Sequence, residues 1–130
     1  MNPQFGKQEW ANYNCGTCAL AVEKNLSGGN ISNVGFDESL RTDAGMEAAT
    51  GKKCVYMPVS EIENHLKRMG PGSHLIVGIN RRLPNGQSID GHWFNAFYDG
   101  NKIHTIDGQC GDTFDWPYDY HNVSEWCAMI

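Results

Sequence analysis

The stretch His92–Asp107, with the sequence HWFNAFYDGNKIHTID, carries the strongest local structural signal in the chain. Two runs rich in β-branched and aromatic residues are separated by Asp99-Gly100, a pair that is typical of a two-residue hairpin turn. If the strands meet at this turn, Tyr98 pairs with Asn101, and the two ends of the stretch stand directly opposite each other. The Cβ atoms of such a pair lie about 4.5–5.5 Å apart. We therefore expect the His92 imidazole and the Asp107 carboxylate to be within hydrogen-bonding reach.

A helix is predicted over residues 14–28, which have the sequence NCGTCALAVEKNLSG. Asn14 is a suitable N-cap and Gly28 a suitable end. The small and apolar residues recur at helical spacing, which indicates a helix with one buried face. The members of that face are Cys15, Cys18, Ala19, Val22 and Leu26.

The rest of the chain predicts short elements separated by glycine-rich turns. We expect a short helix over residues 38–49, a strand over 54–57, a helix that runs to Met69 with Ser60 as its N-cap, a buried strand over 73–80 and a short helix over 123–129. Arg81-Arg82 is interpreted as a solvent-exposed pair before a turn. The aromatic residues of the tail are interpreted as cover for the core: Trp116, Tyr118, Tyr120 and Trp126.

Length and charge limit the classes of protein. The chain has 130 residues, 40% of them hydrophobic, which suits one domain with one core. Its net charge of −5 disfavours nucleic acid as a partner. The longest apolar run, residues 74–79, is far shorter than the roughly 20 residues of a membrane span. We therefore expect a single domain over residues 1–130 with no nucleic-acid or membrane partner, either cytosolic or part of a longer chain.

Three residues suggest covalent catalysis by a thiol. A cysteine at a helix start, such as Cys15, is favoured as the thiolate by the helix dipole and by free N–H groups. A histidine can take the thiol proton, and an acid can orient the imidazole. His92 and Asp107 supply such a pair. The chain order Cys, His, Asp is that of papain-like enzymes.

The motifs around these residues resemble a known family. Asn14-Cys15-x-x-Cys18-Ala19, Gly91-His92-x-Phe94-Asn95 and Ile106-Asp107-Gly108-Gln109 are similar to the papain-fold toxin family of bacterial polymorphic toxins, which is also described as glutamine deamidase-like. The resemblance implies a papain-like α+β fold, in which an N-terminal nucleophile helix packs on a small antiparallel sheet. It also implies a Cys-His-Asp site, a place at the C-terminal end of a longer secreted protein, and a neutralising immunity protein.

The function expected is a cysteine-dependent protein glutamine deamidase, acting as a toxin or effector domain in the cytoplasm of a target cell. A papain-like protease or a transglutaminase would use the same triad, because each begins with attack of the thiolate on an amide or peptide carbonyl. A binding module without catalysis is a further alternative. No cofactor and no metal are expected, and the chain is expected to be a monomer with a protein substrate.

Several residues are alternatives or supports for the triad. Cys18 is the second candidate nucleophile, because the second cysteine reacts in the similar papain motif. Gln109 is a candidate to orient the imidazole or bind substrate, and Gln8 to supply an oxyanion-binding amide. Asn14 is more simply explained as an N-cap. Cys15 and Cys18 could also form half of a zinc site, but the other three cysteines stand alone in the sequence.

Overall fold

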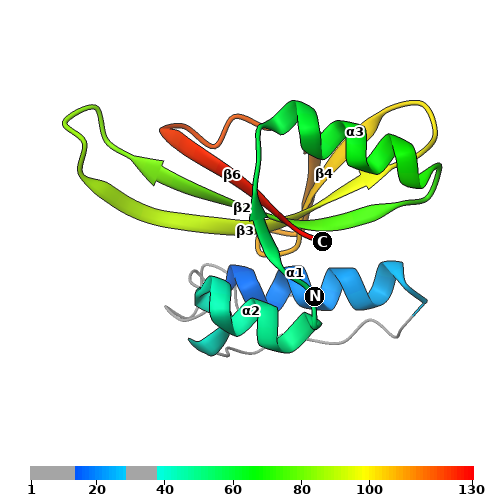
Figure 1. Cartoon of the computed structure of the whole chain (residues 1–130), viewed down its shortest axis with the longest axis horizontal. Helices are drawn as coiled ribbons and strands as arrows, with labels where there is room; N and C mark the ends of the chain where they lie inside the picture. Colours follow the sequence, from blue (N-terminus) through cyan, green and yellow to red (C-terminus); the bar gives the residue numbers. More distant parts are fainter. Residues whose placement is uncertain (1–13, 29–37) are drawn as a thin grey trace.

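A computed structural model describes residues 14–28 and 38–130 of the chain. Within these residues, six strands form one antiparallel sheet in the order β1-β6-β2-β3-β4-β5. Helix α3 lies on one side of the sheet, and α1 and α2 lie on the other (Figure 1). The helical elements are α1 (Cys15–Leu26), the 3-10 helix η2 (Glu38–Arg41), α2 (Asp43–Thr50) and α3 (Val59–Met69). The strands are β1 (Cys54–Tyr56), β2 (His74–Arg82), β3 (Ser88–Tyr98), β4 (Ile103–Asp107), β5 (Asp112–Asp115) and β6 (Val123–Met129).

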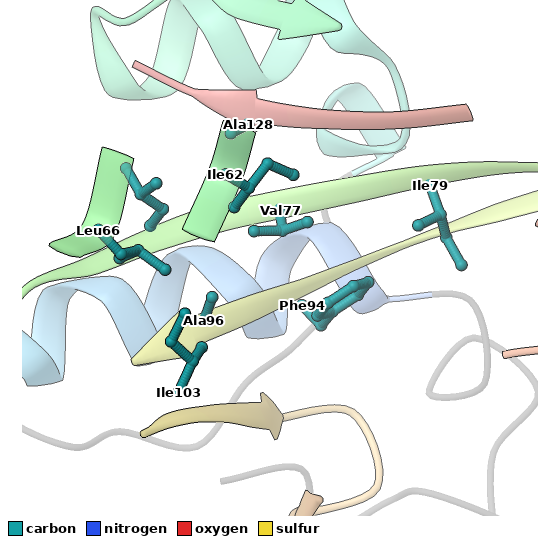
Figure 2. Packing of buried hydrophobic residues seen from close by; sticks show 9 residues of the cluster. Ile62, Leu66, Val77, Ile79, Phe94, Ala96, Ile103 and Ala128 are labelled. Carbon is teal, nitrogen blue, oxygen red and sulfur yellow. The ribbon is translucent and has the colours of Figure 1, made fainter. Parts of the chain in front are cut away.

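The main core lies between α3 and the sheet. Ile62 and Leu66 are one helical turn apart on α3 and are fully buried against the central strands. Figure 2 shows both in one cluster with Val77 of β2 and Phe94 of β3. Phe94 is 0% exposed, and its ring contacts the partly buried aromatic side chains of the tail. The expectation that these aromatic residues cover the core is confirmed for Trp116, Tyr120 and Trp126.

A second core holds α1 against the opposite face of the sheet. Ala19 of α1 packs with Ile76 and Trp93, so the predicted apolar face of this helix is confirmed. The buried Asn95 side chain donates a hydrogen bond to the carbonyl of Ala19 at 3.1 Å. His74 of β2 contacts Glu23 at 2.7 Å. These polar contacts fix the position of α1 along the sheet.

The hairpin between β3 and β4 forms, but with a different register from the one predicted. Tyr98 pairs with Ile103 and not with Asn101, so the turn is centred one residue later. The Asp99 carboxylate accepts hydrogen bonds from the backbone N–H groups of Asn101 and Lys102, both at 2.7 Å. Asp99 therefore caps the turn from its first position, while Gly100 takes the positive φ of 96°.

Because the register moves by two residues, every side chain stays on its predicted face. The ladder between β3 and β4 ends at Asn95 and Ile106. Asp107 pairs instead with Asp112 of β5. The prediction that His92 stands directly opposite Asp107 is therefore wrong, although both residues point to the same side of the sheet.

The prediction of a helix over residues 123–129 is also wrong, because this segment is strand β6. It fills the space between β1 and β2 and pairs with both. Seven residues gain little from an isolated helix, whereas two strand edges offer backbone hydrogen bonds on both sides. Alternation then buries Cys127 and Met129 on the α1 side and Ala128 on the α3 side.

Two other boundaries differ from the sequence prediction. Helix α3 begins at Val59, and its N-cap is Pro58 and not Ser60. The short helix expected over residues 38–49 is divided into η2 and α2, because Thr42 interrupts it. The Thr42 hydroxyl accepts a hydrogen bond from the Gly45 N–H at 3.1 Å and so caps α2.

We predict that Gly108→Ala destabilises the contact between α1 and the end of β4. A Cβ atom at this position would lie 2.8 Å from Val22 Cγ2 and 3.3 Å from the carbonyl oxygen of Cys18. The expected loss in the free energy of unfolding is about 1–3 kcal/mol, measured by urea denaturation.

The double variant Gly108→Ala/Val22→Ala is the control, since Val22→Ala removes the closest clashing methyl group. We expect it to lose less stability than the two single variants added together. Strict additivity would contradict the proposed close approach.

Candidate active site

Cys15 is the first residue of α1 and is partly exposed. The 3-10 helix η2 packs closely against this end of α1. A Cβ atom on Gly16 would overlap the Leu40 carbonyl oxygen, so only glycine fits there. The carbonyl of Asn14 accepts the first helical hydrogen bond, from the Cys18 N–H at 2.9 Å. Asn14 is therefore the N-cap residue as predicted, although its buried side chain makes no capping hydrogen bond.

His92 and Asp107 form a buried pair. The distance between His92 Nε2 and Asp107 Oδ2 is 2.7 Å, and the two residues are 8% and 5% exposed. The predicted contact is thus confirmed, and it forms diagonally across the hairpin. Cys15 lies close enough to the His92 ring to help raise the pKa of the imidazole. Because Asp107 engages Nε2, Nδ1 is the ring nitrogen that remains available to a neighbouring thiol.

These contacts favour a charged imidazole. Burial alone lowers the pKa of His92, but the hydrogen bond and charge of Asp107, together with the nearby Cys15, outweigh it and raise the pKa to about 9. Burial raises the pKa of Asp107, while the hydrogen bond and charge of His92 lower it below its usual range. Because the His92 pKa is raised above 6.5, its stabilising contribution is full below pH 6.5 and is lost as the pH rises through about 9.

Asp107 is held by three further donors. Its Oδ1 accepts hydrogen bonds from the backbone N–H groups of Gln109 at 3.1 Å and Cys110 at 3.4 Å. Its Oδ2 accepts a hydrogen bond from the Tyr120 hydroxyl at 2.8 Å. These hydrogen bonds therefore fix the orientation of the carboxylate toward the imidazole.

Tyr120 is a site residue that sequence reasoning missed. Its ring centroid lies 5.0 Å from that of His92, so it covers the imidazole as well as bonding the carboxylate. Burial and the negative charge of Asp107 raise the pKa of Tyr120, so its hydroxyl remains a donor. From the sequence, Tyr120 is one of several aromatic residues in the tail, and nothing in the pattern indicates a contact with Asp107. Its contact depends on how residues 116–122 return over the sheet, and no spacing rule gives that path.

A cavity of about 280 Å³ opens beside this group and is lined by both Cys15 and His92. Trp93 lines it from the α1 side of the sheet, pointing away from His92 as alternation predicts. Gln109 also lines the cavity, which agrees with its expected place near the site. Arg81 is a lining residue too and is partly buried, so its interpretation as simply solvent-exposed is wrong.

The remaining candidates are placed differently. Cys18 is 1% exposed, and burial together with the neighbouring Cys15 raises the pKa of its thiol to about 12. Both its burial and its raised pKa disfavour the thiolate form that a nucleophile needs. Gln8 lies outside the described residues.

The fold and this arrangement of side chains place the protein in the class of papain-like α+β proteins. Residues 13–112 match the family model described as papain fold toxin 1, glutamine deamidase, and the chain belongs to this family. No curated protein matches the sequence.

Among the helices that the structure describes, none is long and apolar enough to cross a membrane. Tyr120 lies beyond the matched residues.

We predict that Tyr120→Phe lowers the free energy of unfolding by about 1–2 kcal/mol, because it removes a hydrogen bond to a buried charged group. The matched control is Tyr118→Phe, two residues away, since Tyr118 is 37% exposed. Urea denaturation at neutral pH measures both. Equal stability of the two variants would contradict the role assigned to the Tyr120 hydroxyl.

Proposed function

We propose that this domain is a cysteine-dependent protein glutamine deamidase that acts as a toxin or effector in the cytoplasm of a target cell. The observation that carries the proposal is the contact of Cys15, at the start of α1, with the buried His92–Asp107 pair beside an open cavity. The family assignment supports the same reaction class. Cys15, His92 and Asp107 are the proposed catalytic residues.

Cys15 is the proposed nucleophile because it alone of the two candidate thiols reaches both the cavity and the imidazole. Cys15 lines the cavity and contacts His92. Cys18 lies one turn further along α1, and its side chain is buried. A buried thiol with a raised pKa supplies almost no thiolate at neutral pH.

The reaction proceeds in two steps at the side-chain amide of a glutamine. The Cys15 thiolate attacks the amide carbon, and the C–N bond breaks as His92 gives a proton to the leaving nitrogen, which departs as ammonia. The thioester that remains is then attacked by water. His92 takes the water proton, the C–S bond breaks, and the product is a glutamate side chain with the thiol restored.

The start of α1 also supplies donors for the developing negative charge. The first N–H groups of a helix have no partner within the helix, and the Asn14 side chain does not cap them. Donors aimed at this position stabilise the oxyanion that forms when the thiolate attacks. Asp107 orients His92, and Tyr120 holds Asp107, so Tyr120 is a positioning residue.

A toxin of this kind needs protection in the cell that makes it. We propose a cognate immunity protein as the second partner, beside the protein substrate, and a monomeric domain that needs no cofactor. A protein that covers the cavity beside Cys15 would block the reaction. This part of the proposal rests on the toxin character of the family and not on a contact within the chain.

We predict that the wild-type protein adds about one mass unit to a glutamine of a target-cell protein, because OH replaces NH₂. The experiment is intact-mass and peptide mapping of target-cell lysate treated with wild type, Cys15→Ala or Cys18→Ala. Wild type and Cys18→Ala should give the same shift, and Cys15→Ala should give none.

Other outcomes would contradict parts of the proposal. New chain termini would show a protease, and an amine adduct on the glutamine would show transamidation. A shift that persists in Cys15→Ala but is lost in Cys18→Ala would make Cys18 the nucleophile. A biological effect that is equal for wild type and Cys15→Ala would favour a binding module without catalysis.

A further inference from the structure

Arg81 brings a positive charge to the wall of the cavity that contains Cys15 and His92. It lies in β2, next to an irregularity in the pairing with both neighbouring strands: the register shifts between Ile79 and Arg81 against β3, and between Asn80 and Arg81 against β6. Such bulges occur near functional sites, where they redirect a side chain. The last regular pair before the shift joins Ile79 to His92.

The Arg81 guanidinium has no anionic partner in the described part of the chain. Its Nε atom is buried and makes no hydrogen bond there. The ion pairs among residues 14–28 and 38–130 all involve histidine, and none involves Arg81. A partly buried cation without a counter-ion is unfavourable, because desolvation is not offset by an attractive charge. A ligand that supplies the missing anion would remove this cost.

The aromatic ring that covers the catalytic pair also holds the guanidinium. Arg81 Cζ lies 5.7 Å from the centroid of the Tyr120 ring. A guanidinium that packs on an aromatic face loses side-chain freedom before it binds a ligand. The same tyrosine bonds Asp107, and Arg81 lines the same cavity as Cys15 and His92.

Among residues 14–28 and 38–130, the cavity wall carries more positive than negative side chains, although the whole chain has a net charge of −5. Arg41 and Arg81 line it, and Asp43 is the one carboxylate among these described lining residues. That carboxylate already accepts a hydrogen bond from the Tyr56 hydroxyl at 2.6 Å. The cleft is therefore suited to a negatively charged group.

We propose that Arg81 is a specificity-determining residue, which binds an acidic side chain of the target protein close to the glutamine that is deamidated. This inference rests on the proposed function, because it describes the sequence around the reacting glutamine. The planar guanidinium can donate two parallel hydrogen bonds to a carboxylate, which a neutral flanking residue cannot accept in the same way. The acidic residue would thus hold the target chain while its glutamine enters the site.

Binding is tested first, separately from catalysis. Fluorescence anisotropy measures the affinity of Cys15→Ala protein for two labelled peptides, which contain one glutamine flanked by glutamate or by alanine. We expect the glutamate peptide to bind about tenfold more tightly, with the preference decreasing as salt is added. A second substitution in the Cys15→Ala protein, Arg81→Gln, should abolish the preference for the glutamate peptide. Adding Arg81→Lys should keep part of it, because the charge remains without the planar fork.

The matched control is Arg82→Gln, which removes the same charge from the next residue. Arg82 is exposed and is not among the residues that line the cavity. Its variant should keep the full preference for glutamate. If Arg82→Gln and Arg81→Gln reduce the preference equally, the effect comes from overall charge, and the assignment to Arg81 is overturned.

Turnover by the wild-type protein separates this inference from the proposed function. Ammonia release that is equal for the two peptides would overturn the role of Arg81 and leave the deamidase intact. Arg81-dependent binding of the glutamate peptide without any ammonia release would support the acidic preference and contradict the deamidase. Equal binding of both peptides to Cys15→Ala protein would overturn the inference whatever the turnover.

Discussion

The 2.7 Å contact between His92 and Asp107 determines how the imidazole is presented to Cys15. A buried carboxylate is costly unless its oxygens are bonded, and here four donors converge on it. The donors come from β3, from the backbone after β4 and from the returning tail. Because these segments must all be in place before the charge is satisfied, the contact links the packing of the sheet to the geometry of the candidate site. Gly108, directly after Asp107, then allows α1 to approach closely.

Local pattern in the sequence was enough to predict the central parts of the fold and of the site. Helix α1 follows from its apolar periodicity, and the β3–β4 hairpin follows from its alternation and its Asp-Gly turn. The register was wrong by two residues because Asp99 caps the turn through its side chain. Side chains alternate with a period of two, so this error left His92 and Asp107 on the same face. The predicted contact was therefore right although the predicted pairing was wrong.

The features that were not predicted depend on contacts between distant parts of the chain. Residues 123–129 form a strand because β1 and β2 leave a place between them. Tyr120 reaches Asp107, and Arg81 reaches Tyr120, through a tail whose path no local signal describes. The family match ends at residue 112, so this tail adds to the site from outside the matched region. We propose that the matched motifs carry the catalytic residues and that the residues added by the tail influence which substrate is accepted.

The most direct measurement is an NMR titration of the His92 ring in the folded wild-type protein, with Asp107→Asn for comparison. We predict that both ring nitrogens of His92 carry protons at neutral pH, with a midpoint near the raised pKa of about 9. We expect a clearly lower midpoint in Asp107→Asn, because the hydrogen bond and charge that raise the pKa are weakened. A wild-type midpoint at or below 6.5, or one that Asp107→Asn leaves unchanged, would contradict the account.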